Sequence, residues 1–128
     1  MRLLLDTHAI LWWFLDDPHL GRIAERELEN PDHEVFVSAA SAWEIATKYR
    51  IGKLPAATQL APSFLSMVGE EGFLPLSVTL RHGHLAGSFA GAHKDPFDRM
   101  LIAQALIEGL TLVSNEAAFD AYGVMRLW

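Results

Sequence analysis

Four acidic residues occupy similar places in the sequence, each near the point where an apolar run gives way to a helical pattern. Several carboxylates brought together repel one another, and burial adds a desolvation cost to each of them. A divalent cation relieves both problems, and oxygen ligands favour a hard ion, Mg²⁺ or Mn²⁺. Such an ion suits phosphodiester hydrolysis. The four residues are Asp6, Glu44, Asp98 and Glu116.

Each of these acids also has a purely structural explanation. Asp6 or its neighbour Thr7 fits the N-cap of a helix, and Ser41-Ala-Trp-Glu44 fits a capping box. Asp98 and Glu116 fit the role of partners of helix dipoles. The two explanations stay open for each residue taken singly.

Asp98 departs from the simple dipole explanation. It precedes Leu101 and Ile102 by three and four residues, so its carboxylate falls on the helix stripe that faces inward. A carboxylate that serves only the helix dipole is expected to prefer solvent.

The elements that must position the acids alternate along the chain between short apolar runs and helical patterns. This alternation predicts an α/β fold with a parallel sheet and helices on both faces. Ligands of such sheets bind outside the carboxyl ends of the strands, where the strand order reverses, and all four acids can reach that rim. The predicted strands are 2–6, 35–37, 73–76, 110–113 and 124–127, and the predicted helices are 9–15, 23–29, 39–50, 58–71, 79–88, 95–108 and 117–121.

Composition narrows the class of protein. The 128 residues, 51% of them hydrophobic, predict one domain over 1–128. Without cysteine there is neither a disulfide nor a thiolate metal site. The net charge of −6 argues against a simple electrostatic nucleic-acid binder, unless metal ions supply the positive charge at the phosphate. The absence of a signal-peptide pattern and of a run of about 20 apolar residues predicts a cytoplasmic protein with no membrane partner.

Four stretches together resemble one family over nearly the whole chain: LLLDTHAILWW, VSAASAWEIATKYRIGKL, HKDPFDRMLIAQA and TLVSNEAAFDAYGVMRLW. In this order they are similar to PIN-domain proteins, specifically the VapC-type ribonuclease toxins of toxin–antitoxin pairs. The resemblance implies a three-layer α/β/α sandwich with a mainly parallel central sheet. It also implies a Mg²⁺- or Mn²⁺-dependent endoribonuclease that cuts RNA, is inhibited by a cognate VapB-type antitoxin, and is usually a homodimer.

The resemblance also implies roles for single residues. The family's first three acids fall on Asp6, Glu44 and Asp98, which would hold the ion directly or through water. The fourth, commonly an aspartate, falls on Glu116, which is longer by one methylene. The accessory positions are Thr7 as a polar neighbour, Asp95 as a cap first and a site member second, and Ser114 as a hydroxyl near the fourth acid.

Basic residues close to the acids have two open interpretations. They can guide the RNA backbone, or they can complement a helix C-terminus, with Glu44 and Lys48 as an ordinary i,i+4 pair. For Arg99, a contact with phosphate or with the antitoxin is as open as a surface salt bridge. The residues are Lys48, Arg50, Lys53 and Arg99.

Histidines and aromatic residues are assigned structural roles. The pair His82-x-His84 is a conceivable zinc site, but the chain has no cysteine and no clear third ligand, so both are predicted to be exposed on a helix. His93 is predicted to be a loop residue. The remaining predictions are helix packing for His8, core packing for Trp43 and Trp128, and a buried helix or dimer face for Trp12, Trp13 and Phe14.

Two other functions compete with metal-dependent hydrolysis. An aspartyl-phosphate enzyme would use Asp6, but the haloacid-dehalogenase pattern needs an acid two residues later, where His8 stands. A Rossmann enzyme is disfavoured because no G-x-G-x-x-G follows Asp6. The other alternative is a catalytically silent PIN-like binding module.

Overall fold

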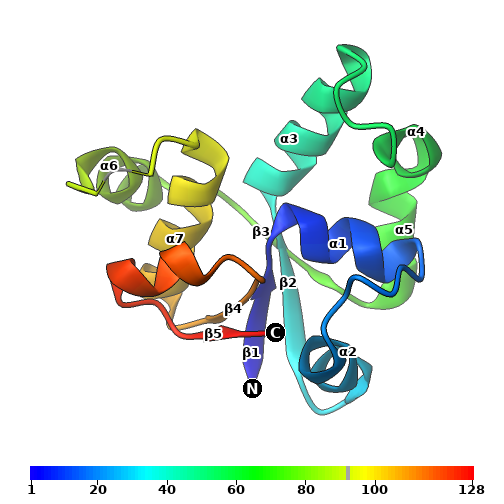
Figure 1. The fold of residues 1–128 in the computed structure, drawn as a ribbon, viewed down its shortest axis with the longest axis horizontal. Helices are drawn as coiled ribbons and strands as arrows, with labels where there is room; N and C mark the ends of the chain where they lie inside the picture. The colour runs from blue at the N-terminus through cyan, green and yellow to red at the C-terminus, as the bar shows by residue number, and fades with distance from the viewer. Residues whose placement is uncertain (92) are drawn as a thin grey trace.

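The computed structural model describes residues 1–91 and 93–128 and is organised around a five-stranded sheet (Figure 1). Its order is β3-β2-β1-β4-β5, and every neighbouring pair is parallel. Parallel neighbours cannot be joined by hairpins, so the chain must cross over between strands. The strands are β1 (Arg2–Leu5), β2 (Glu34–Ser38), β3 (Leu74–Leu76), β4 (Thr111–Val113) and β5 (Arg126–Leu127).

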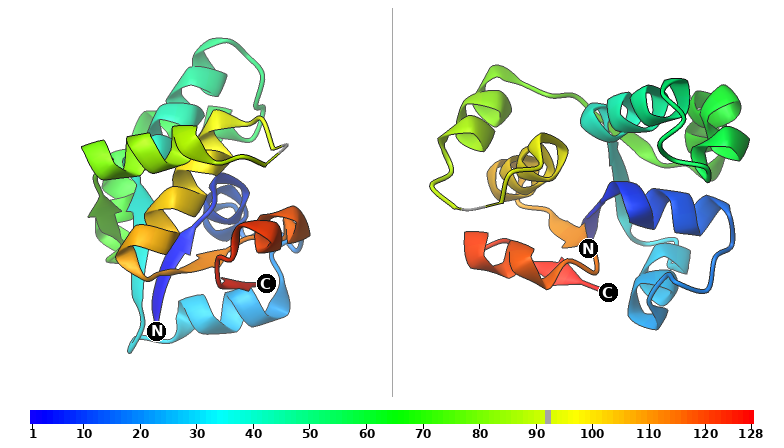
Figure 2. Two further views of the ribbon diagram at one scale, coloured as in Figure 1. Left: turned by 90° about the vertical axis from the view of Figure 1, so that its left-hand side faces the viewer. Right: turned by 45° about the horizontal axis from the view of Figure 1, so that its top comes forward.

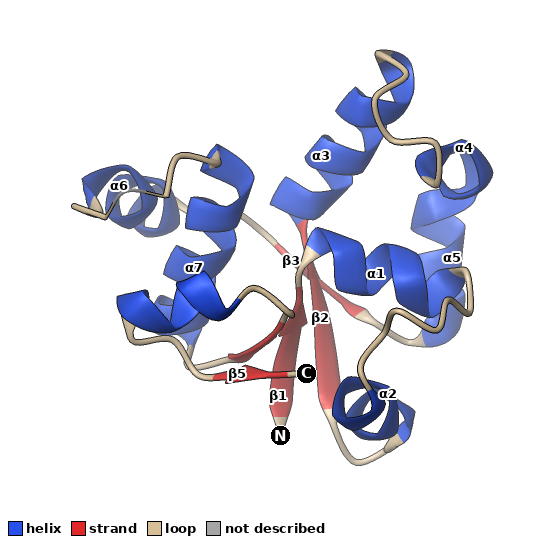
Figure 3. Cartoon of the chain, in the orientation of Figure 1, coloured by secondary structure: helices blue, strands red, loops and turns tan. Residues whose placement is uncertain are grey.

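Helices cover both faces of this sheet (Figures 2 and 3). In Figure 1 one group lies to the right of the strands and includes α1 to α5, while α6 and α7 lie to the left. The predicted three-layer α/β/α sandwich with a parallel sheet is therefore confirmed. The helices are α1 (Thr7–Phe14), α2 (Arg22–Glu29), α3 (Ala39–Arg50), α4 (Ala57–Leu60), η1 (Ala61–Ser63), α5 (Phe64–Glu71), α6 (Leu80–Ser88), α7 (Pro96–Glu108) and η2 (Ala117–Tyr122).

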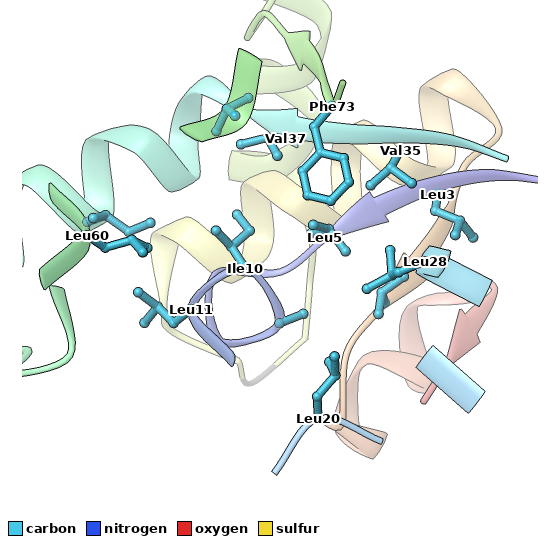
Figure 4. Packing of buried hydrophobic residues seen from close by; sticks show 14 of the residues in the cluster. Leu3, Leu5, Ile10, Leu11, Leu20, Leu28, Val35, Val37, Leu60 and Phe73 are labelled. Carbon is cyan, nitrogen blue, oxygen red and sulfur yellow. The ribbon is translucent and has the colours of Figure 1, made fainter. Parts of the chain in front are cut away.

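The three leucines of β1 divide between the two layers of core. Successive side chains of a strand point to opposite faces of the sheet. Leu3 and Leu5 belong to the cluster formed with α1, α2, α3, α4 and α5, part of which is drawn in Figure 4. Leu4 belongs to the cluster formed with α7, β4 and η2. A strand buried on both faces explains why this run is continuously apolar rather than alternating.

The strand order reverses beside β1. The chain builds β2 and β3 on one side of β1 and then returns to add β4 and β5 on the other side. The carboxyl ends of β1 and β4 are therefore adjacent, and the backbone N–H of Asp6 donates to the carbonyl of Val113 at 3.1 Å. Ligand sites of parallel sheets form at such a reversal.

The single helix predicted over 58–71 is wrong. The segment is divided into α4, the short 3₁₀ helix η1 and α5. Pro62 lies in the middle of η1 and has no N–H to donate to the carbonyl four residues earlier, which interrupts an α-helix. The other predicted elements are present with ends shifted by a few residues, and the predicted helix 117–121 is a 3₁₀ helix.

The alternative explanation of Ser41–Glu44 as a capping box is excluded. Helix α3 begins earlier, because Ser38 is its N-cap and accepts from the N–H of Ala40 at 3.0 Å. A capping box occurs instead at α6, where the Thr79 hydroxyl accepts from His82 N–H and the His82 ring accepts from Thr79 N–H.

His82 is buried, which contradicts the prediction that it is exposed, whereas His84 is exposed as expected. Since Nδ1 of His82 accepts from Thr79, the ring proton resides on Nε2, which lies 3.0 Å from Oε1 of Glu108 on α7. His82 therefore joins α6 to α7 and does not form a zinc pair with His84.

The tryptophans divide in a way that their sequence did not indicate. Trp128 is partly buried and packs against the cluster that contains Leu3 and Leu5, as predicted. Trp12, Trp13 and Phe14, for which a buried helix or a dimer face was predicted, are partly buried against the same cluster. Trp43 is 66% exposed, so its predicted place in the core is wrong. It lies on α3, immediately before the buried Glu44.

No helix among the residues that the structure describes combines the length and the apolar character needed to cross a membrane.

We expect His82→Ala to lower the free energy of unfolding by about 2 kcal/mol, because it removes the α6 capping box and the contact with Glu108. Urea denaturation followed by circular dichroism measures this loss. His84→Ala, on the exposed face of the same helix, is the matched control and should change stability by less than about 0.5 kcal/mol. Equal losses in the two variants would contradict the bridging role of His82.

Candidate active site

Asp6 is a buried carboxylate at the carboxyl end of β1, only 5% exposed. It is the N-cap of α1, and its Oδ1 accepts from the backbone N–H of Ala9 at 2.8 Å. Burial raises the pKa of Asp6 to about 6, although hydrogen bonds from the Ser114 hydroxyl and from Ala9 N–H oppose that rise. The nearby charge of Asp98 adds to the rise. Asp6 therefore caps a helix and also carries an unfavourable charge in a desolvated place.

Glu44 is the second buried acid and is 6% exposed, on the face of α3 that meets α1. The Thr7 hydroxyl donates to its Oε1 at 2.6 Å and lies 3.2 Å from the Ser41 hydroxyl. Because Thr7 has one hydroxyl proton, which goes to the carboxylate, Ser41 acts as donor to Thr7. Lys48 pairs with the other oxygen, Oε2. Thr7 follows Asp6 directly, so this contact fixes Glu44 relative to the end of β1.

Asp98 reaches the same region from the first turn of α7. Asp95 is the N-cap, as predicted, and accepts from the N–H groups of Phe97 and Asp98 at 2.9 and 3.1 Å. The Asp98 carboxylate lies 2.7 Å from Nε2 of His93. Desolvation raises the pKa of Asp98, the His93 contact lowers it, and the charges of Asp95 and Glu44 raise it further.

His93 has a place in the site that the sequence analysis missed, because it was assigned only to a loop. A signal was available, since His93 lies five residues before Asp98, in the segment that leads into a capped helix. The ring of His93, three residues before α7, contacts the carboxylate in the first turn of that helix.

The charges of the three acids act on one another. The charge of Asp98 raises the pKa of Asp6, and the charge of Glu44 raises the pKa of Asp98. The pKa of Lys48 is raised by its hydrogen bond to Glu44 and by the charges of Asp95 and Asp98. These effects link Asp6, which follows β1, with Asp98 on α7 and Glu44 on α3.

Glu116 occupies a different position from the other three acids. It is exposed, and its charge acts on Arg126 at the far edge of the sheet. Its backbone N–H donates to the Ser114 hydroxyl at 3.1 Å, and Ser114 in turn donates to Asp6. Through the main chain, this segment orients the first acid.

The basic residues do not form one group. Lys48 is paired with Glu44, so the i,i+4 interpretation is correct for that pair. Arg50 and Lys53 are exposed at and beyond the C-terminal end of α3. Arg99 is not part of a surface ion pair within the described chain, because its three guanidinium nitrogens donate to the backbone carbonyls of Ala86, Phe89 and His93. Arg99 therefore holds the segment that presents His93.

The donor set fits a hard cation in its chemistry. The three acids supply oxygen ligands of the kind that hard cations prefer, and desolvation by burial raises the pKa of both Asp6 and Asp98. Within residues 1–91 and 93–128, no three His, Asp or Glu side chains already stand in an arrangement that would enclose an ion. The contacts of Glu44 with Lys48 and of Asp98 with His93 take up part of each carboxylate.

Comparison with known proteins agrees with this geometry. The model of the PIN domain family matches residues 3–124. Ribonuclease VapC22 of Mycobacterium tuberculosis is 32% identical over 117 residues, which cover 88% of this chain and 85% of that protein. The chain therefore belongs to the PIN-domain family, and within it to the VapC group.

Solved structures share the fold at low sequence identity. A VapBC2 complex from Rickettsia felis, bound to a DNA fragment from its promoter, contains a chain with a TM-score of 0.73 and 17% identity, covering 99% of this chain and 98% of that one. VapC20 of Mycobacterium tuberculosis, a toxin that cleaves the sarcin–ricin loop, gives 0.66 and 18%, with 96% of each chain covered. At these identities the likeness establishes the fold.

We expect Asp6→Asn to stabilise the metal-free protein at neutral pH. The pKa of about 6, above the ordinary 3.8, means that the ionised carboxyl destabilises the folded state. Below pH about 4 the carboxyl is protonated in both the folded and the unfolded chain; as pH rises through the folded pKa, that stability is lost. Asn removes the charge and keeps an oxygen for Ala9 N–H, so the free energy of unfolding should rise by about 1–3 kcal/mol above pH 7.

Chemical denaturation in EDTA across this pH range tests the expectation. Asp17→Asn is the control, because Asp17 is only partly buried and its hydrogen bonds with His19 lower its pKa. Neutralising Asp17 should bring no stabilisation. A loss of stability in Asp6→Asn at high pH would refute the proposed cost of the buried charge.

Proposed function

We propose that this chain is a metal-dependent endoribonuclease that acts as the toxin of a type II toxin–antitoxin pair. The observation that supports the proposal is that the charges of Asp6, Glu44 and Asp98 act on one another beside the reversal of strand order, where Thr7 joins Glu44 to the residue after Asp6. The similarity to VapC22, a ribonuclease, over most of both chains supports RNA as the substrate.

In this proposal Asp6, Glu44 and Asp98 hold Mg²⁺ or Mn²⁺, directly or through water. When bound, the ion supplies a Lewis acid and lowers the pKa of a water so that it can attack phosphorus. The chain's own residues orient the carboxylates, with Thr7 on Glu44, Ser114 on Asp6 and His93 on Asp98.

The outer residues have supporting roles in the same proposal. Lys48 balances the charge of Glu44, and Lys48, Arg50 and Lys53 guide the RNA backbone from the C-terminal end of α3 and the residues beyond it. Asp95 fixes the first turn of α7 that carries Asp98. Glu116 acts at longer range, through water or through the Ser114 contact.

We also propose a small VapB-type antitoxin as the inhibitory partner, a homodimer as the assembly and the cytoplasm as the location. The Rickettsia felis and Haemophilus influenzae chains that share this fold come from VapBC complexes. Expression with the neighbouring gene of its operon should yield a complex in which RNA cleavage is suppressed. Recovery of the chain alone, fully active, would contradict the inhibitory partner.

We expect the purified chain to cleave RNA with Mg²⁺ or Mn²⁺, and EDTA to abolish the activity. Asp6→Asn and Asp98→Asn should each lower the cleavage rate by about 10²-fold or more, because each removes a charged ligand from the ion. Glu116→Gln should cause a smaller loss, since its charge lies toward Arg126. Mapping of cut RNA ends by sequencing identifies the substrate.

Thermal unfolding gives a second measurement that does not depend on activity. Mn²⁺ should raise the melting temperature of the wild-type chain, because an ion that binds only the folded state stabilises it. The increase should be absent in Asp6→Asn and present in Asp17→Asn. Cleavage that persists in EDTA and in both aspartate variants would refute the metal-dependent mechanism, and a phosphate-labile adduct at Asp6 would favour the aspartyl-phosphate enzyme instead. A folded chain that binds RNA or a partner without cutting would be the silent module.

A further inference from the structure

Trp43 is an exposed aromatic residue immediately before one of the proposed catalytic acids. Its side chain is 66% exposed, whereas the next residue, Glu44, is buried. Adjacent helix positions point about 100° apart, so α3 directs the carboxylate toward α1 and the indole toward a different side. Single exposed apolar residues are common on protein surfaces, so the place of the indole beside the acids, and not its exposure alone, makes it a candidate contact.

Phe97 provides the indole with a support on the opposite helix. The two ring centroids are 5.0 Å apart with an interplanar angle of 70°, an edge-to-face contact. Phe97 immediately precedes Asp98, just as Trp43 immediately precedes Glu44. The aromatic pair thus spans α3 and α7 at the level of the two acids, and the contact limits the movement of an otherwise exposed ring.

Charge alone gives this site little attraction for RNA. The chain has a net charge of −6, and Asp6, Glu44 and Asp98 repel phosphate until a cation compensates them. The Lys48 ammonium is already paired with Glu44, and the Arg99 guanidinium is taken up by backbone carbonyls. Contact with a base, which is uncharged, supplies binding that these carboxylates do not oppose.

We propose that Trp43, supported by Phe97, is a stacking platform for an unpaired nucleobase next to the scissile phosphate. This proposal rests on the proposed RNA cleavage and adds a preference for single-stranded segments, because a base in a duplex has no free face. Every base has a π-face, so the platform tolerates different bases and favours the larger purines. Trp43 is a specificity-determining residue and takes no part in the chemistry.

The experiment compares the affinity of the chain for nucleic-acid strands that carry bases and for strands that lack them. Labelled single-stranded oligo(A) of about 12 nucleotides, an abasic strand of the same length, and an oligo(A)–oligo(U) duplex are titrated with the full-length chain carrying Asp6→Asn to prevent cleavage. Fluorescence anisotropy gives each Kd. We expect oligo(A) to bind about 5- to 100-fold more tightly than the abasic strand, and more tightly than the duplex.

Trp43→Ala in this background should remove most of the preference for oligo(A) over the abasic strand and leave the affinity for the abasic strand unchanged. Trp43→Phe should keep a part of the preference for oligo(A), because the smaller ring still stacks. Leu80→Ala is the matched control for loss of apolar surface, because Leu80 is 92% exposed on α6 and far from the acids in sequence. Thermal unfolding of each variant confirms that the fold is retained.

Three results would overturn the platform: no preference of the parent chain for bases, the same preference in Trp43→Ala, or an equal loss in Leu80→Ala. A change of oligomeric state in Trp43→Ala with RNA discrimination unchanged would assign Trp43 to a protein contact instead. Failure of the proposed function is a separate result, namely that the wild-type chain cleaves no RNA with Mg²⁺ or Mn²⁺. In cleavage assays, the platform predicts that Trp43→Ala raises KM with little change in kcat.

Discussion

The desolvated carboxylate of Asp6 is the constraint on which the site depends. It closes a strand buried on both faces and caps the helix that follows, so its position is fixed by the core and by α1 together. The same burial makes its negative charge unfavourable, and the charge of Asp98 nearby makes it more so. A strongly shifted carboxyl at the rim of a parallel sheet is a candidate for a functional role.

The surrounding contacts serve to bring the other acids to this point. Thr7 couples Glu44 on α3 to the residue after Asp6, and Ser114 couples the end of β4 to Asp6 itself. Arg99 anchors the segment before α7 through three carbonyls, and that segment presents His93 to Asp98. Each acid thus has a neutral or cationic neighbour that fixes its orientation, and each neighbour comes from a different part of the chain.

The sequence predicted the elements and the sheet, because apolar runs, caps and glycines are local signals. Asp95 as the N-cap of α7 and Gly109, whose left-handed backbone conformation ends that helix, are examples. It did not predict the burial of His82 or the exposure of Trp43, since both depend on which neighbouring helix lies across the side chain. Nor did it predict the contact of His93 with Asp98, which depends on the path of a loop.

The candidate site shows the same division. Position after a strand or in a first turn selected Asp6, Glu44 and Asp98, while the orientation of Glu116 toward Arg126 followed from the packing of the last strands. Residue type gave the chemistry, and tertiary contacts decided which members of the set meet.

The alternation of the leucines in β1 ties the two core layers to one register of the strand. Removing or adding one residue there would exchange the two core layers, sending Leu4 to the side of α1 and its neighbours to the side of α7. The same shift would move the Asp6 carboxylate, which follows β1, away from β4. An insertion or a deletion in this strand would therefore disturb the packing of the core and the position of Asp6 together.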